Sequence, residues 1–400
     1  MQDENGENKF LVNTGIENTN QASVIVLKFD GQGNYIDSVT LKGYLYGEVD
    51  VTEINKEGNF VVSLEFDSDN VEVSGQHTVS GENEVIEGDG TNNSRDVAIF
   101  YFDDNLKVVW SYGLEIYANN WCGGLSIDDN GDVIFGGTYW YAYTFPAEDT
   151  EAGEELKITP NGAYDLMFLR FNKEGKIQYA NSIGGTERDY ASYINRIEGD
   201  GYIATGYSAG SITIPAEDTV KQEEIVLNKS ATDSYRGIII KYTEDNKVEW
   251  AFDLGEAYNF TSCEEYNNQY LVTAVRYSYD EFEIPGNMTE DGQPIKIEDG
   301  TSGLLLFVNK DGKIIRVVGS SEYSFSSVKN IENELYASYS YQLLKIYQKE
   351  ILPSVPDMQQ ITVDNYKKQY SIWTYVNGEG GTISGQNQPP YEQVNIHENS

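Results

Sequence analysis

The chain has 400 residues, of which 27 are Lys or Arg and 65 are Asp or Glu, so its formal net charge at pH 7 is −38. Such a charge repels nucleic acid phosphates and anionic lipid surfaces, which argues against nucleic acid as a partner. A chain of this length exceeds what one hydrophobic core normally serves, so we expect either several domains or a repeated small core.

The sequence shows no sign of membrane insertion. No apolar run approaches the roughly 18 residues of a membrane span, and the first residues lack the basic start and apolar stretch of a signal peptide. We therefore interpret the chain as a mature form or an excised, monomeric module of a longer protein.

One phrase recurs along the chain: an apolar run, a basic or aromatic position, an Asp/Asn/Gly turn and a second apolar strand. The runs are 24–29, 97–102, 166–171, 238–242, 304–308 and 343–346. Aligning the copies on Lys28, Tyr101, Arg170, Lys241 and Phe307 gives spacings of 73, 69, 71 and 66, and Lys345 follows after 38. A near-constant period indicates one repeated unit, and repeated units of several strands typically close into a β-propeller.

Each repeat contains four predicted strands, a to d. In the repeat that contains the run 238–242 they are 192–198, 202–207, 237–242 and 248–254, with hairpin-type turns between a and b and between c and d. Strand c is apolar at successive positions, as in 166–169, which is typical of a strand covered on both faces. The first copy lacks an obvious strand a and the last lacks a clear strand d. We predict an all-β protein, a propeller of about six four-stranded blades, with five to seven compatible.

The middle copies carry a family resemblance. The segment 165–185 (DLMFLRFNKEGKIQYANSIGG) and the segment 200–207 (DGYIATGY) resemble the propeller-type repeats of bacterial cell-surface and secreted proteins (SBBP-like repeats). The likeness covers about residues 8 to 350. It implies a β-propeller and a location outside the cell or on its surface.

The end of the chain is different in character. Residues 369–400 resemble the opening of a small β-repeat module that follows such propellers in surface proteins, on the motifs GGTISG and PYE. Pro353 and Pro356 precede it and favour a linker. We therefore predict a propeller over 1–350, a linker over 351–362 and a partial C-terminal β-repeat module over 363–400.

Long excursions separate strands b and c in four copies, at 67–95, 144–164, 210–235 and 280–302. Three share a phrase that begins Phe145-Pro146, Ile214-Pro215 or Ile284-Pro285, followed by a short apolar stretch, so each is predicted to be an extra hairpin. In an antiparallel blade the b-to-c and d-to-a connections emerge at one end. All insertions are therefore expected on one face, which we predict to be the binding face.

Aromatic residues in the d-to-a connections are expected at that same end. The candidate ligand-binding residues are Trp121, Trp140, Tyr190, Tyr258 and Tyr323. They could form a sugar-stacking surface whose affinity depends little on salt. The alternative is that these rings pack between blades.

The sequence offers few residues that suit catalysis or metal binding. His77 and His397 are the two histidines and lie far apart in the repeat scheme, while Cys122 and Cys263 are expected to be buried free thiols, with a bridge or a reactive site as the alternatives. The acidic turns at 128–132 and 67–70 lack the full spacing of a calcium loop. No catalytic residue, metal site or cofactor is predicted, and calcium binding is left open.

Three functions stay open. The first is a non-catalytic extracellular or cell-surface propeller, an adhesion-type module that binds a glycan or a protein through the insertion face. The second is a spacer or scaffold module of a large surface protein. The third is a carboxylate-based carbohydrate-active enzyme. A deep pocket with two close, desolvated acidic side chains would support this function.

Overall fold

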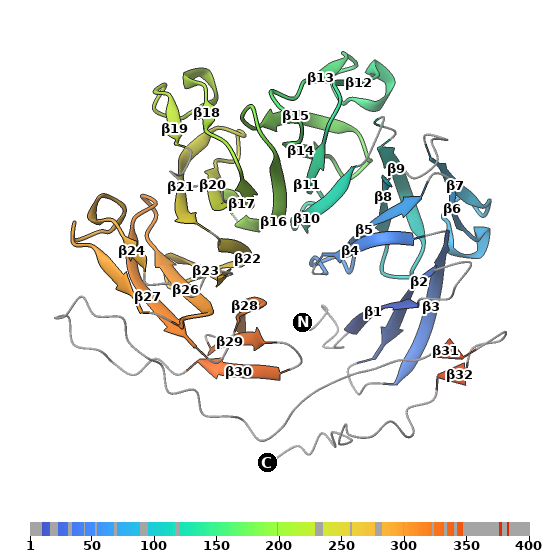
Figure 1. Cartoon of the computed structure of the whole chain (residues 1–400). Coiled ribbons are helices and arrows are strands. Elements are labelled where there is room, and N and C mark those ends of the chain that lie inside the picture. The colour runs from blue at the N-terminus through green and yellow to red at the C-terminus, as the bar shows by residue number, and fades with distance from the viewer. Residues whose placement is uncertain are drawn as a thin grey trace. The chain divides into compact units, whose positions relative to one another are not determined.

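The computed structural model describes most of residues 10–346 and two short stretches beyond them (Figure 1). The described ranges are 10–16, 23–30, 34–43, 45–52, 54–67, 70–88, 95–114, 116, 120–197, 199–228, 235–256, 258–276, 282–298, 300–321, 324–331, 334–339, 342–346, 376–377 and 382–383. Over these ranges the regular elements are β-strands and four short 3-10 turns, η1 to η4. The prediction of an all-β protein is confirmed. No helix in the described part is long and apolar enough to span a membrane.

The chain divides into two compact units, Met1–Phe260 and Thr261–Ser400, and the division falls within strand β22 (Tyr258–Tyr266). Each unit contains its own antiparallel sheets and its own buried apolar residues. The predicted linker at 351–362 lies outside the described residues. Of the predicted C-terminal module, β31 (Val376–Asn377) and β32 (Thr382–Ile383) are described and pair with each other.

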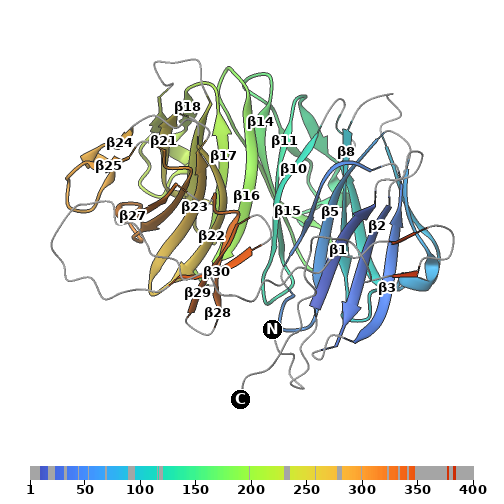
Figure 2. The ribbon, with the colours of Figure 1, turned by 60° about the horizontal axis from the view of Figure 1, so that its bottom comes forward.

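The first unit contains three complete four-stranded antiparallel sheets, each with its strands in chain order a, b, c, d. The second sheet comprises β4 (Leu45–Val51), β5 (Phe60–Asp67), β8 (Arg95–Phe102) and β9 (Val108–Leu114). The third comprises β10 (Trp121–Ile127), β11 (Val133–Tyr139), β14 (Asp165–Phe171) and β15 (Ile177–Ile183). The fourth comprises β16 (Asp189–Ile197), β17 (Gly201–Ser208), β20 (Arg236–Tyr242) and β21 (Val248–Glu256). Figure 2 shows the strands from β10 to β17 standing side by side.

The remaining sheets follow the same plan. The first sheet begins with β1 (Phe10–Ile16), β2 (Ser23–Phe29) and β3 (Tyr35–Lys42), which correspond to strands b, c and d, as predicted for a copy without strand a. The fifth contains β22, β23 (Gln269–Arg276), β26 (Gly303–Val308) and β27 (Ile314–Ser320). The sixth contains β28 (Ser327–Ile331), β29 (Glu334–Tyr339) and β30 (Gln342–Ile346). The repeated sheet is thus confirmed, and its closure into a propeller stays a prediction.

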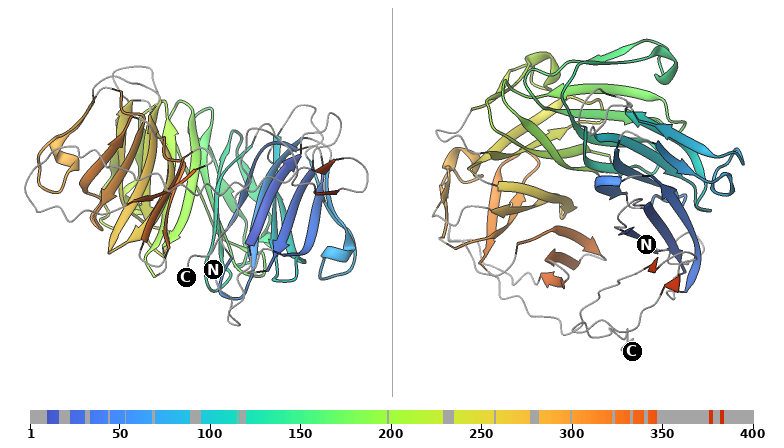
Figure 3. Two further views of the ribbon diagram at one scale, coloured as in Figure 1. Left: turned by 90° about the horizontal axis from the view of Figure 1, so that it is seen from below. Right: turned by 45° about the vertical axis from the view of Figure 1, so that its right-hand side comes forward.

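Strand c is buried on both faces, as its unbroken apolar sequence predicted. In β14, Leu166 and Phe168 pack with the fourth sheet, whereas Met167 and Leu169 pack with the second. All four are at most 1% exposed. Because consecutive sheets of the first unit share these side chains, the core of the unit lies between its sheets. Figure 3 shows this stacking of strands from blue to yellow-green.

The four predicted insertion hairpins are present. They are β6 (Asn70–Val73) with β7 (Glu84–Glu87), β12 (Tyr143–Phe145) with β13 (Leu156–Ile158), β18 (Ile212–Ile214) with β19 (Ile225–Leu227), and β24 (Phe282–Ile284) with β25 (Ile295–Ile297). The 3-10 turns between their strands are η1 (Gly75–His77), η2 (Ala147–Asp149), η3 (Ala216–Asp218) and η4 (Gly286–Met288).

A threonine closes the turn of each hairpin and explains the phrase found in the sequence. In β12–β13, Thr150 Oγ1 donates to the Ala147 carbonyl and accepts from the Glu154 amide at 3.1 Å each. The Thr150 backbone also bridges to Ile177, the first residue of outer strand β15, and the equivalent bridges recur at Thr78, Thr219 and Thr289. The tip of each hairpin therefore lies beside the c–d turn of the repeat that contains it, and β6 also pairs with β3 of the first sheet.

The path of the hairpins shows that one part of the prediction was wrong, namely that the insertions lie entirely on the binding face. The hairpins leave the sheets from the predicted end, but they fold back along the outer strands, so their tips reach the opposite end. The apolar residues Phe145, Ile214 and Ile284, which precede the turns, are fully buried. Burying these side chains against the outer strands is favourable, which gives the hairpins a packing role.

Both cysteines are buried and form no disulfide. Cys122 is 3% exposed in β10 and Cys263 is fully buried in β22. The prediction of two buried free thiols is confirmed.

Candidate functional site

Seven aromatic residues meet at one end of the third and fourth sheets. Trp121 begins β10 and Tyr190 is the second residue of β16, whereas Trp140 follows the end of β11. Tyr164 and Tyr235 directly precede the c strands β14 and β20. The other two members are Tyr141 and Tyr207. Because neighbouring strands are antiparallel, starts of a and c and ends of b share one end of a sheet. We call this group the ring cluster.

The rings form a continuous chain of contacts. Trp140 stacks on Tyr141 with ring centres 5.4 Å apart and contacts Tyr164 at 4.8 Å. Tyr164 is 5.6 Å from Tyr190, which is 6.1 Å from Tyr235. Trp121 meets Tyr164 edge-on at 4.8 Å, and Tyr207 stacks on Tyr190 at 4.9 Å. Each such pair adds about 0.5–1.5 kcal/mol beyond area burial, so the rings hold one another in place.

The cluster has buried and exposed members. Tyr164 is 8% exposed and forms the base, whereas Trp140, Tyr141 and Tyr235 are 36%, 42% and 39% exposed. Burial raises the pKa of the Tyr190 phenol above its ordinary value. The protonated phenol can donate a hydrogen bond. The surface offers apolar ring faces next to phenol hydroxyls.

Two arginines lie over rings of the cluster. The Arg95 guanidinium carbon is 5.8 Å from the ring centre of Trp121, and that of Arg188 is 5.7 Å from the ring centre of Tyr164. Both distances fall within the range of cation–π contacts. Arg95 also pairs with Glu65 at 3.4 Å, and Glu65 accepts from the Cys122 amide at 3.0 Å. Arg188, by contrast, is exposed.

Two buried carboxyl groups anchor the loops beneath the rings. Asp165 accepts the backbone amides of Asn161 at 2.7 Å and Gly162 at 3.3 Å, and Asp189 accepts that of Gly185 at 2.6 Å. Burial raises the pKa of Asp165 to about 6, with the nearby Asp189 charge adding to the shift, and it raises the pKa of Asp189 as well. Both are fully buried, so they fix the backbone on either side of Tyr164 and Tyr190.

The structure brings together three of the five predicted ligand-binding residues, Trp121, Trp140 and Tyr190. For Tyr258 only the backbone, in β22, is described, and Tyr323 lies outside the described residues. Sequence reasoning missed Tyr141, Tyr164, Tyr207 and Tyr235. A signal existed for two of them: Tyr164 and Tyr235 both directly precede strand c and are 71 residues apart, the distance from Arg170 to Lys241.

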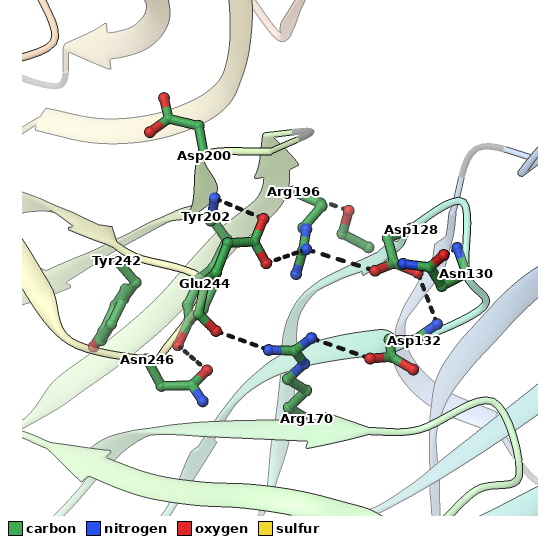
Figure 4. A network of polar contacts seen from close by, with 12 residues as sticks. Asp128, Asn130, Asp132, Arg170, Arg196, Asp200, Tyr202, Tyr242, Glu244 and Asn246 are labelled. Atoms are coloured by element: carbon green, nitrogen blue, oxygen red, sulfur yellow. Dashed lines mark hydrogen bonds and ion pairs between the residues drawn. The ribbon is translucent and has the colours of Figure 1, made fainter.

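The opposite end of the same sheets carries a network of ion pairs (Figure 4). Arg196 lies between Asp128, at 3.5 Å, and Glu244, and its backbone amide donates to Ser126 Oγ at 3.0 Å. Arg170 donates to Asp132 at 3.0 Å and to the Glu244 carbonyl at 2.9 Å. The network thus connects the a–b turn of the third sheet with the c–d turn of the fourth.

An equivalent contact in another repeat indicates that the Arg170 contact is structural. Lys28, at the equivalent position of the first sheet, donates to the Asp104 carbonyl in the c–d turn of the second sheet. In the turn at 128–132, Asp128 accepts the amides of Asn130 and Asp132 at 2.8 and 2.9 Å, so this carboxylate folds the turn. The contacts of Lys28 and Arg170 thus join consecutive sheets, whereas Lys241, at the equivalent position of the fourth sheet, donates to the Asp200 carbonyl of its own sheet.

An open groove of about 790 Å³ also lies at this opposite end. The tip of hairpin β18–β19 and the turn between β20 and β21 form its walls. Its lining residues are Ala216, Glu217, Thr219, Val220, Gln222, Thr243, Asp245 and Lys247. The groove is separate from the ring cluster and from the two buried carboxyl groups.

No protein-family model matches the chain, and neither does any curated protein. Among solved structures, it is similar to a protein of unknown function from Bacteroides caccae, with 8% identity over 78% of this chain and 94% of that chain and a TM-score of 0.28. It is also similar to a DUF4221 family member from Bacteroides vulgatus, with 11% identity over 84% of this chain and 89% of that chain and a TM-score of 0.32. The resemblance to SBBP-like repeats stays a prediction.

Proposed function

We propose that the protein is a non-catalytic extracellular or cell-surface module that binds a glycan on the ring cluster. The supporting observation is the row of aromatic rings at one end of the third and fourth sheets, with Trp140, Tyr141 and Tyr235 exposed. Sugars present C–H faces that stack on aromatic rings and hydroxyl groups that pair with phenols. A row of rings suits an extended chain of sugars better than a single sugar.

The observations favour this role over the two alternatives. A pure spacer has no need of three large exposed rings that connect to the buried Tyr164, directly for Trp140 and through Trp140 or Tyr190 for the other two. A carboxylate enzyme needs its acids within reach of substrate, whereas Asp165 and Asp189 are fully buried and hydrogen-bonded to backbone amides. The insertion hairpins, which bury Phe145, Ile214 and Ile284 against the outer strands, then support the scaffold.

The proposal predicts the effect of removing two exposed rings. In a glycan array followed by calorimetry with the best ligand, Trp140→Ala together with Tyr235→Ala should weaken binding by about 1–3 kcal/mol, because each stacked ring contributes about 0.5–1.5 kcal/mol. For an uncharged glycan, moderate salt should change the affinity little, since stacking is screened far less than charge pairing.

Tyr35→Ala is the matched control, because Tyr35 is 53% exposed on β3, in a different sheet. Circular dichroism should show that both variants keep the fold of the unaltered protein, although the double variant loses four ring contacts and should be less stable. The proposal fails if no glycan binds the intact protein, or if the Trp140 and Tyr235 double variant binds as tightly as the Tyr35 variant. Selective binding of a protein by the same surface would replace the glycan as ligand.

A further inference from the structure

The arginines at the ring cluster stand out in a chain with a net charge of −38. Arg95 is compensated by Glu65, a carboxylate that is 1% exposed. Arg188 differs, because it is exposed and no carboxylate of the described residues pairs with it. Its charge is therefore free to act on a ligand at the rings.

Backbone contacts hold the main chain of Arg188 in place. Its carbonyl accepts the Ala209 amide at 3.0 Å, and its backbone bridges to that of Tyr164. The guanidinium lies over the Tyr164 ring. Its positive charge lowers the pKa of the Tyr190 phenol, against the larger effect of burial, which raises it. A guanidinium held on an aromatic face loses less freedom when it forms a two-pronged contact with a carboxylate.

These contacts also decide the sign of the ligand charge. Exposed aromatic rings in an acidic protein could act as a cage for a cation. Here the guanidinium groups of Arg95 and Arg188 already lie over the rings of Trp121 and Tyr164, so a cationic ligand would meet like charges there. An anionic group instead meets two opposite charges there, and this local attraction has to outweigh the repulsion from the chain's net charge of −38.

We propose that the ring cluster recognises an acidic glycan, with a uronic acid carboxylate on the Arg188 guanidinium and neighbouring sugars on Trp140 and Tyr235. This inference rests on the proposed glycan binding and adds the chemical class of the ligand. Recognition then combines stacking, which tolerates many sugars, with one charged contact that selects the carboxylate.

The test uses ligands that differ only in the carboxylate. Hexasaccharides of galacturonic, glucuronic and mannuronic acid, and the carboxyl-reduced form of each, are titrated into the full chain by calorimetry. We expect at least one acidic form to bind about ten-fold or more tightly than its reduced partner, because a charged hydrogen bond contributes that much. Raising the salt from about 50 to about 300 mM should weaken the acidic ligand and leave the reduced one nearly unchanged.

Variants then assign the contact. Arg188→Gln should remove the preference for the acidic form, so that the acidic and the reduced ligand bind with equal affinity, and Arg188→Lys should restore only part of the preference because it lacks the planar fork. Lys173→Gln is the control, since it removes an exposed positive charge at the opposite end of the third sheet. It should have no effect on either ligand.

The outcomes separate this inference from the proposed function. Equal affinity for acidic and reduced forms, or binding to neutral array glycans alone, overturns the acidic ligand and leaves glycan binding in place. A preference that survives Arg188→Gln overturns the role of this arginine. Absence of binding to every acidic and neutral glycan overturns both proposals.

Discussion

Ile240→Ala should lower the free energy of unfolding of the first unit by about 2–5 kcal/mol. Ile240 is fully buried in strand c of the fourth sheet and belongs to the apolar core that the third and fourth sheets share. Its removal leaves a cavity that two close-packed sheets cannot fill without shifting. Chemical denaturation of the variant, followed by tyrosine and tryptophan fluorescence, measures the change.

The matched control is Val226→Ala, a change of an apolar residue that is 43% exposed on β19. It should alter stability by less than about 0.5 kcal/mol. Leu304→Ala tests the same assignment in the second unit, because Leu304 is fully buried in strand c of the fifth sheet. Unchanged melting of Ile240→Ala or Leu304→Ala would contradict the strand assignment.

The repeated sheet could be predicted because its signal is local and recurs. The run from Leu166 to Leu169 is apolar at every position, which requires cover on both faces, and the structure provides that cover from the two neighbouring sheets. The hairpin insertions were predicted for the same reason, since their Pro-x-x-x-Thr phrase occurs three times. Gly131 and Gly175, with φ of 87° and 81°, show why glycine recurs in the short turns.

The path of the insertions could not be predicted from that signal. Thr150 pairs with Ile177 and Thr219 with Val248, across 27 and 29 residues, and nothing in the hairpin sequence specifies which edge it will join. The buried residue before each proline was a hint, because an apolar side chain in an exposed loop has no favourable environment. The sequence predicted each excursion to be a hairpin, and placed all of it on the face from which it leaves its sheet, which is the end of the ring cluster.

The sequence predicted some members of the ring cluster and missed others. Tyr190 followed from alignment of the turns, because its position recurs as Tyr258 and Tyr323 in other repeats, and Trp121 followed because it stands next to Asn120, which holds that position in the third sheet. Tyr164 and Tyr235 also recur, but the chain has 31 tyrosines, and that background hides a single repeated pair. The arginines gave no signal, because Arg95 and Arg188 occupy different strand positions and meet the rings only in the folded sheets.

Asp165→Asn should change how the stability of the first unit depends on pH. Burial raises the pKa of Asp165 from 3.8 to about 6, so the folded protein holds this proton more tightly than the unfolded chain. The protonated carboxyl therefore favours folding below about pH 4, and this contribution is lost as the pH rises through about 6. A shift of about two pKa units corresponds to about 3 kcal/mol. Asp165→Asn should therefore reduce the change in the free energy of unfolding across this pH range by up to that amount.

Denaturation of the protein and of Asp165→Asn at intervals between about pH 4 and pH 7.5 measures the difference. Asp245→Asn, a change of an exposed carboxylate in the turn between β20 and β21, should leave the pH dependence as it is. If Asp165→Asn followed the same curve as the unaltered protein, Asp165 would have to titrate normally. The carboxyl beneath Tyr164 would then be hydrated, and the packed base of the ring cluster would have to be looser than the contacts of Asp165 with Asn161 and Gly162 indicate.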